Sequence, residues 1–350
     1  MKELMKLAVL IPFILLINAG YVQAIDLPPV TVGIKTVYYA DTKRGRPIVA
    51  DIYYPVDAKQ VGEATLSIMV QAKQARDVPI INPKDSGGYP LIVLSHGYGG
   101  SRHHLSWFAE DLSSKGYIVA AIEHFGNTAS FDTPQISLKR WLRPQDVTEF
   151  LNQFLQDSNW KKVINPNRIG FAGFSLGGLT GVWLVGGIAD KYDKPVVGKS
   201  SIYELSLGAT QAYVDEIDFA QARESYKDDR IKAAFLMAPA QGGSFSPKGL
   251  KSITVPTFIV VGEKDEIAPA IANAGYYARN IKNSKFKMLK GNVSHLAFRN
   301  SVKPDKLNCA TAFEFELNPE VNIEAVHNET AKLAIDFFDK VLGSNVLLKD

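Results

Sequence analysis

Cysteine is almost absent from this chain of 350 residues, which contains Cys309 alone. An intramolecular disulfide framework is therefore excluded, and a zinc site built from several cysteines would lack its ligands. Without a partner in the chain, Cys309 is either buried and inert or available for pairing with another molecule, and we expect it to be buried. The paired-histidine spacing H-E-x-x-H is also missing, so nothing in the sequence supports a catalytic metal.

An excess of charge of either sign is missing as well. The chain has 39 Lys and Arg against 36 Asp and Glu, which leaves a formal net charge of +3. This near balance gives no basic stripe of the kind that binds nucleic acid. With 46% hydrophobic and 21% charged residues, the chain can bury enough surface to fold, so the sequence excludes intrinsic disorder.

A run of apolar residues long enough to span a membrane is lacking, and the N-terminal run is short. Leu7 to Ile17 is apolar, follows Lys2 and Lys6, and precedes the small-residue exit at residues 22–24. A transmembrane helix needs about 20 residues. The pattern predicts a signal peptide over 1–24 and an exported protein, periplasmic or secreted. An uncleaved N-terminal anchor is the alternative, and no cysteine follows the run to carry a lipoprotein anchor.

The remaining residues, 25–350, show no repeat or low-complexity tract, and we expect them to form a single domain. Alternating β-rich segments at 30–39 and 47–54 predict an antiparallel pair of strands. Later strands are apolar throughout, and they alternate with helical stretches such as 106–115, 144–157 and 328–342. This pattern predicts the α/β class, with a mostly parallel central sheet covered by helices on both faces. The predicted later strands are 91–94, 117–122, 168–172, 233–237, 256–261 and 285–289.

Residues 189–230 are too long for a simple crossover between two strands. They carry many charges and scattered aromatic residues, and we expect an excursion that packs over one end of the sheet. Two interpretations stay open: a cap that contacts substrate, and a surface elaboration without function.

The sequence Gly173-Phe174-Ser175-Leu176-Gly177 follows a predicted strand and precedes an apolar stretch. This G-x-S-x-G pattern between strand and helix is typical of a nucleophile elbow. The chain must turn sharply there, and glycines on both sides of Ser175 remove Cβ atoms that would clash. The start of the following helix would supply N–H groups for a developing oxyanion. We predict that Ser175 is a nucleophile.

A serine nucleophile needs a base held by an acid, in the chain order Ser, Asp or Glu, His. His295 follows the predicted strand 285–289, so it lies at the same edge of the sheet as the elbow. His327 lies at the start of the closing helix, where we expect a surface residue. Position alone does not choose the acid among Glu263, Asp265 and Glu266, and we prefer Asp265 near the apex of its turn.

The oxyanion hole needs two backbone donors. One is the N–H of Leu176, and the glycine-rich loop 95–100 supplies the other, which we assign to Tyr98. We expect the Tyr98 side chain to line the acyl pocket. The remaining histidines receive structural roles: His96 and His124 near the site, His103 and His104 on the surface.

With these residues, the chain resembles the α/β-hydrolase superfamily, in particular predicted dienelactone hydrolases and platelet-activating factor acetylhydrolase-like serine esterases. The stretches that carry the resemblance are 94–100, 116–124, 143–147 and the elbow, within roughly residues 32–300. Cutinase-like polyester hydrolases are also similar, with an aromatic residue where this chain has Tyr98. The resemblance implies Ser175, Asp265 and His295 as the triad, and Tyr98 and Leu176 as backbone donors. Dienelactone hydrolases carry Cys at the elbow, so Ser175 favours ordinary carboxylic esters.

The expected function is a serine hydrolase that cleaves small-molecule or lipid carboxylic esters through an acyl-enzyme, without a cofactor. One alternative is a lipase or phospholipase that contacts a membrane surface transiently. The other is a non-catalytic binding protein on a hydrolase fold. The sequence indicates neither the acyl chain length nor an oligomeric state.

Overall fold

The computed structural model describes residues 32–57, 74–83, 87–198, 209–300 and 320–343. The predicted signal peptide, 1–24, and Cys309 lie outside the described residues. Within these ranges, no helix combines the length and the apolar character that a membrane crossing requires.

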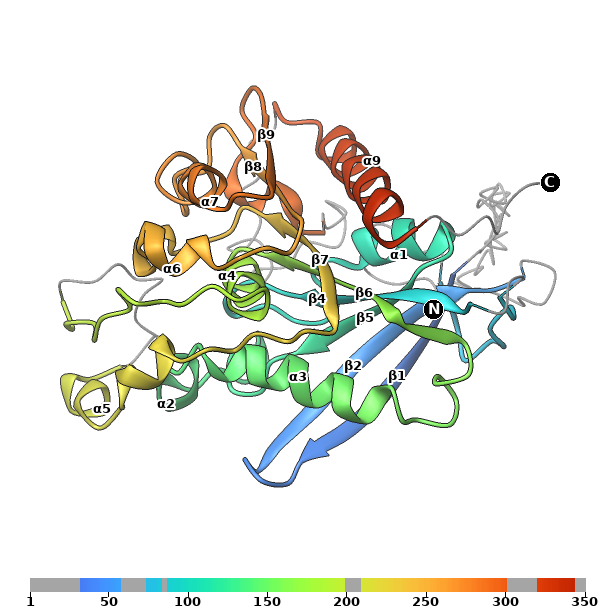
Figure 1. The fold of residues 1–350 in the computed structure, drawn as a ribbon, viewed down its shortest axis with the longest axis horizontal. Helices are drawn as coiled ribbons and strands as arrows, with labels where there is room; N and C mark the ends of the chain where they lie inside the picture. Colours follow the sequence, from blue (N-terminus) through green and yellow to red (C-terminus); the bar gives the residue numbers. More distant parts are fainter. Residues whose placement is uncertain (1–31, 58–73, 84–86, 199–208, 301–319, 344–350) are drawn as a thin grey trace, which may run out of the picture.

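The described residues form a sheet of nine strands in the order β3-β1-β2-β5-β4-β6-β7-β8-β9 (Figure 1). Strands β1 and β2 pair antiparallel, as do β2 and β5, and all other pairs are parallel. The predicted α/β fold with a mostly parallel sheet is therefore confirmed. The strands are β1 Val32–Asp41, β2 Arg46–Pro55, β3 Gln74–Arg76, β4 Tyr89–Ser95, β5 Ile118–Glu123, β6 Ile164–Phe174, β7 Ile231–Met237, β8 Thr257–Gly262 and β9 Ser284–Leu289.

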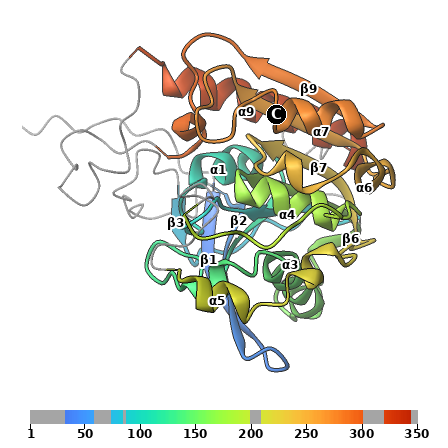
Figure 2. The same cartoon turned by 90° about the vertical axis from the view of Figure 1, so that its left-hand side faces the viewer.

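Helices cover both faces of the sheet, and neighbouring residues of one strand show which helix lies where. Phe235 in β7 packs against Phe108 of α1 and Phe338 of α9. The adjacent Leu236 points the other way, toward Gly181 of α4. Figures 1 and 2 show α1 and α9 together on one side of the sheet. The helices are α1 Ser106–Ser114, α2 Pro134–Ser137, α3 Leu142–Phe154, α4 Leu176–Leu184, α5 Gln211–Asp215, α6 Pro247–Lys251, α7 Ala274–Asn280 and α9 Ile323–Leu342, with short 3₁₀ turns η2 Phe219–Arg223, η3 Gly242–Ser244 and η4 His295–Phe298.

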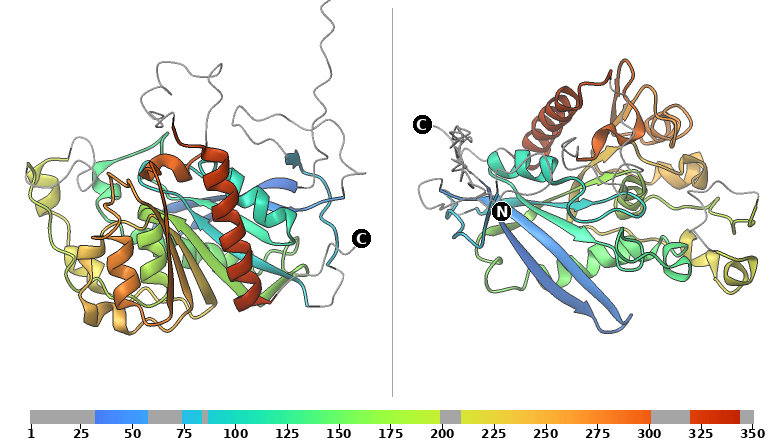
Figure 3. Two further views of the ribbon diagram at one scale, coloured as in Figure 1. Left: turned by 90° about the horizontal axis from the view of Figure 1, so that it is seen from above. Right: turned by 180° about the vertical axis from the view of Figure 1, so that it is seen from behind.

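Two elements differ from the sequence expectation. The stretch between β2 and β4, for which the sequence predicts no strand, contains the three-residue strand β3 parallel to β1. A strand this short carries no periodic pattern that a sequence could reveal. The closing helix α9 starts at Ile323 rather than at residue 328, because Asn322 accepts the Ala325 N–H and caps it. Figure 3 shows this helix lying across the sheet.

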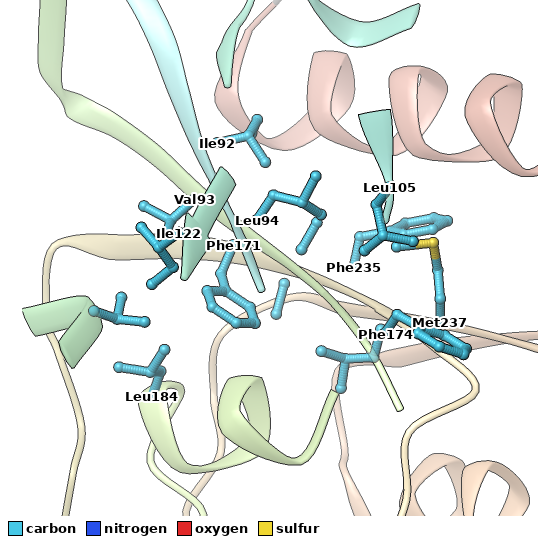
Figure 4. Close-up of a cluster of buried hydrophobic side chains, with 14 of the residues drawn as sticks. Ile92, Val93, Leu94, Leu105, Ile122, Phe171, Phe174, Leu184, Phe235 and Met237 are labelled. Atoms are coloured by element: carbon cyan, nitrogen blue, oxygen red, sulfur yellow. The ribbon is translucent and has the colours of Figure 1, made fainter. Parts of the chain in front are cut away.

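The hydrophobic core lies on both sides of the central strands. Strand β4 is buried along its whole length, which requires apolar residues facing both helical layers. Figure 4 shows Ile92 on the side of the sheet that α9 covers, and Phe171 with Leu184 on the side of α4. This packing fixes the carboxyl ends of β4, β6 and β8, from which the loops of the candidate site extend.

We predict that Phe235→Ala destabilises the fold by about 3–5 kcal/mol, because it opens a cavity in the densest part of the aromatic core. Phe235 stacks on Phe108 at 5.8 Å and on Phe258 at 5.2 Å between ring centroids. The control is Phe286→Ala on the edge strand β9, where Phe286 is 41% exposed. Urea unfolding measures both variants, and equal losses would contradict this account of the core.

Candidate active site

Ser175 occupies the sharp turn between β6 and α4. Its backbone has φ 55° and ψ −113°, a conformation that a residue with a side chain adopts only under constraint. Two hydrogen bonds to the β7 end supply that constraint: Ser175 N–H donates to Met237 O at 2.9 Å, and Ala240 N–H donates to Ser175 O at 3.2 Å. The serine is held in its strained position by the neighbouring strand.

The two glycines of the elbow are required by close backbone contacts. A Cβ on Gly177 would stand 2.1 Å from Ser95 O, and one on Gly173 would stand 2.3 Å from Gly177 O. Neither distance is possible for real atoms, so the G-x-S-x-G spacing follows from the approach of the α4 start to the β4 end.

Asp265 and His295 meet at the same edge of the sheet. The imidazole Nδ1 of His295 lies 2.7 Å from Asp265 Oδ2, and the two side chains are 3% and 0% exposed. The other oxygen of Asp265 accepts the Ala268 N–H at 2.6 Å. Because a carboxylate only accepts, the proton of the neutral imidazole lies on Nδ1 and Nε2 is left as an acceptor.

The structure also separates Asp265 from the two neighbouring carboxylates. Glu263 pairs with Lys290 Nζ at 3.0 Å and accepts the Gly291 N–H. Glu266 reaches the backbone N–H of His295, at 3.4 Å, and not its ring. Asp265 is therefore the carboxylate of this turn that contacts the imidazole.

Ser175 and His295 line one cavity of about 200 Å³. Tyr98 and Gly97 of the loop after β4 form another part of its wall, with Ile267 and Leu296 opposite. The His295 ring also packs on Phe174, with centroids 4.9 Å apart. Among the described residues, no group of three or more His, Cys, Asp or Glu is arranged to hold a metal ion.

The candidate oxyanion donors are the backbone N–H groups of Leu176 and Tyr98. Leu176 is the first residue of α4, where the N–H has no acceptor within the helix. Gly97, which precedes Tyr98, lies so close to the elbow that an added Cβ would stand 3.3 Å from Ser175 Cβ. Tyr98 lines the cavity as expected, and its phenol donates to Asp132 Oδ2 at 2.8 Å.

Two histidines expected on the surface are buried, and that expectation was wrong for both. His327 is 2% exposed, stacks on Trp107 at 3.9 Å between centroids, and contacts Ala297 O and Arg299 O through Nε2. His104 is also buried and lines the cavity. The earlier start of α9 explains the first error, because it places His327 on the buried face of a helix.

His327 and Trp107 support the segment that carries His295. Trp107 Nε1 donates to Phe298 O at 2.9 Å, and Asn300 N–H donates to His104 O at 2.9 Å. Trp107 of α1 and His327 of α9 thus both hold backbone carbonyl groups in or next to η4.

Next to the loop after β4 lies a buried polar cluster whose members the sequence analysis did not connect with one another. Asp146 of α3 accepts two hydrogen bonds from Arg46, both at 2.8 Å, and lies 3.2 Å from His124 Nδ1. His124 Nε2 in turn contacts Ser95 Oγ at 2.9 Å. The stretch 143–147 and His124 stood out in the sequence, but no spacing rule joins them to Arg46.

The charges of this cluster are set by competing effects. Burial would raise the pKa of Asp146, but hydrogen bonds from His124 and Arg46 outweigh it and lower the pKa to about 2. Burial lowers the pKa of His124 to about 3, with the Arg143 charge acting in the same direction. The cluster therefore holds an ionised aspartate and a neutral histidine at neutral pH.

The excursion 189–230 does not line the catalytic cavity in its described part, 189–198 and 209–230. Residues 191–196 line a second cavity of about 490 Å³ instead, together with Arg140 and Gln241. Trp141 is buried against Phe219 and Tyr192 of the excursion. Phe131 is exposed.

A sheet of this order, with a strained serine between strand and helix and an Asp–His pair beside it, is the arrangement typical of α/β-hydrolases. Comparison with known proteins agrees. The model of the family "Platelet-activating factor acetylhydrolase, isoform II" matches residues 58–140. Cutinase est1 of Thermobifida alba is 24% identical over 222 residues, which cover 62% of this chain and 57% of that protein.

Two further relatives match over shorter or similar lengths. The platelet-activating factor acetylhydrolase of Canis lupus familiaris is 57% identical over 42 residues, 12% of this chain and 10% of that protein. Cutinase 1 of Thermobifida cellulosilytica is 22% identical over 207 residues, 59% of each protein. The chain thus spans less than two thirds of the relatives it matches. The fold and these matches show that the chain is similar to α/β-hydrolase-like serine esterases.

The buried histidines predict a loss of stability in mild acid. Burial lowers the pKa of His104 and His124 to about 3 and of His327 to about 4, and that of His96 falls well below its usual value of 6.5. Between those values and pH 6.5 the unfolded chain binds more protons than the folded one. The free energy of unfolding should therefore decrease as the pH is lowered below 6.5, by up to about 1.4 kcal/mol per pH unit for each histidine.

Urea unfolding at pH 7, 6, 5 and 4.5 measures this slope. The variant His327→Gln, which keeps a donor for the two carbonyl groups, should lower the slope by about one proton. A urea midpoint that stays constant from pH 7 to pH 5 would contradict the neutral burial of these side chains.

Proposed function

We propose that this protein is a serine ester hydrolase that cleaves carboxylic esters through an acyl-enzyme intermediate. The observation that carries the proposal is the 2.7 Å contact between His295 Nδ1 and Asp265 Oδ2, because His295 lines the same cavity as Ser175. An oriented imidazole beside a serine hydroxyl that borders the same cavity is the arrangement that activates the serine.

In the proposed reaction, Ser175 Oγ attacks the ester carbonyl while His295 Nε2 takes its proton. The N–H groups of Leu176 and Tyr98 stabilise the oxyanion of the tetrahedral intermediate. The alcohol leaves with the proton from His295, and water activated by the same imidazole then releases the acid. Asp265 keeps the proton of the neutral imidazole on Nδ1. The scheme uses no cofactor.

A lipid ester is the second candidate substrate class, because the family match and the 42-residue match are both to platelet-activating factor acetylhydrolases. The apolar cavity residues Ile267 and Leu296 and the 61% exposed Ile271 are compatible with an acyl chain at a lipid surface. Activity that rises sharply above the micellar threshold of the substrate would support it, whereas equal specific activity below that threshold favours a soluble ester.

The proposal extends to the rest of the chain. Residues 1–24 act as an export signal, and residues 25–350 form one domain around the sheet. The protein then meets its substrate outside the cytoplasm.

We predict that Ser175→Ala lowers the turnover of a short p-nitrophenyl ester by at least about 10³-fold, because the nucleophile is lost. Since Ala fits the same turn as Ser, the urea midpoint should stay close to that of the parent protein. Turnover that survives this substitution would remove the mechanism and revive a non-catalytic binding role.

Asp265→Asn should lower kcat by up to about 10⁴-fold, because an amide no longer fixes the imidazole tautomer. Glu263→Gln and Glu266→Gln are matched controls from the same turn, and each should keep kcat within about twofold because neither side chain contacts the imidazole ring. A larger loss of kcat in either control than in Asp265→Asn would show that Asp265 is not the acid of the triad.

A further inference from the structure

A buried arginine anchors the loop that carries Tyr98. Arg143 of α3 donates to Asn127 Oδ1 at 2.7 Å, to Ser95 Oγ at 3.3 Å and to the carbonyl oxygen of His96. All three acceptors are neutral, while the charge is balanced by the nearby Asp146. One guanidinium thus joins the end of β4 to the loop after β5.

The loop after β5 carries these contacts on to Tyr98. Because Arg143 only donates, Asn127 must turn its oxygen toward it and its amide nitrogen away. That nitrogen donates to Asp132 Oδ1 at 3.3 Å, and Asp132 Oδ2 accepts the Tyr98 phenol at 2.8 Å. An isolated bridge between Gly100 and Thr128 joins the two loops, and a second bridge, between Asn127 and Asp132, lies within the loop after β5.

The backbone of Tyr98 is held from its other side. His96 Nδ1 lies 2.7 Å from Gly97 O, and His96 Nε2 accepts the His124 N–H at 3.3 Å, which places the imidazole proton on Nδ1. Because a peptide unit is planar, fixing Gly97 O also fixes the direction of the Tyr98 N–H. Tyr98 is therefore secured at its peptide by His96 and at its phenol by Asp132.

We propose that Asp132, held by Asn127 and Arg143, is a positioning residue that keeps the Tyr98 N–H aimed at the oxyanion. This inference rests on the proposed ester hydrolysis. Oxyanion donors act only when they lie about 2.7–3.1 Å from the charge that develops, so a small displacement of Tyr98 costs rate. The phenol contact lies at the rim of the cavity and can be removed without changing the peptide that donates.

The test uses Tyr98→Phe, Asp132→Ala and the double variant in the full chain. Each single variant should lower kcat by about tenfold, less than the 10²–10³-fold cost of deleting a donor, with KM within about twofold. The double variant should lose no more than either single one, because both remove the same hydrogen bond. Affinity for a trifluoromethyl ketone, whose adduct places an oxyanion in the site, should fall by the same factor as kcat/KM.

Ser130→Ala is the matched control, because Ser130 lies in the same loop. Within the described residues, its side chain forms a hydrogen bond to Thr128 Oγ1 and to no other side chain. Its kcat should equal that of the parent protein. Arg143→Lys tests the buried arginine that holds Asn127. It keeps the positive charge but cannot form all the hydrogen bonds of the guanidinium, so its kcat should fall at least as far as that of Asp132→Ala. The exposed Asp132 carries the test if the buried arginine variant does not fold.

Losses that multiply in the double variant, or single variants whose kcat stays within about twofold, would overturn the positioning role. If the same preparations still depend on Ser175, the proposed function stands and this inference alone falls. If the parent protein cleaves no ester, both fall together.

Discussion

The site depends on a single steric constraint, the contact between the start of α4 and the end of β4. Gly177 approaches Ser95 O so closely that no Cβ fits between them, and Gly173 approaches Gly177 in the same way. This contact forces Ser175 to φ 55° and presents its side chain at the cavity. The strain is maintained because β7 holds the serine backbone on both sides of the residue.

Around this constraint, buried polar groups determine which atoms can donate and which can accept. His295, His96 and His124 each have one ring nitrogen directed to a carboxylate or carbonyl oxygen. The Nε2 atom of each ring is then an acceptor. His124 Nε2 faces Ser95 Oγ, His96 Nε2 accepts the His124 N–H, and His295 Nε2 takes the serine proton in the proposed mechanism. Burial lowers the pKa of His96 and His124 and favours their neutral imidazoles, so the donors of these two residues are fixed at neutral pH.

The elbow and the sheet could be predicted because their causes are local. Apolar runs with helical spacers specify a parallel sheet, and the glycines around Ser175 specify the turn. The choice of Asp265 over Glu263 needed the structure, because side-chain direction in a charged turn is set by Lys290 and by the backbone at Gly291. The burial of His327 depended on where α9 begins, and the joining of Arg46 to Asp146 depended on contacts between distant segments. Neither the start of α9 nor the contact between Arg46 and Asp146 corresponds to a residue spacing that can be recognised in the sequence.

The account as a whole rests on the reactivity of one hydroxyl. Treatment of the intact protein with a fluorophosphonate, followed by peptide mass analysis, tests it directly. The account predicts one covalent adduct, on Ser175, and strong suppression of the labelling in His295→Ala. An absence of adduct on Ser175 in the folded protein, or equal labelling of other serines, would contradict it.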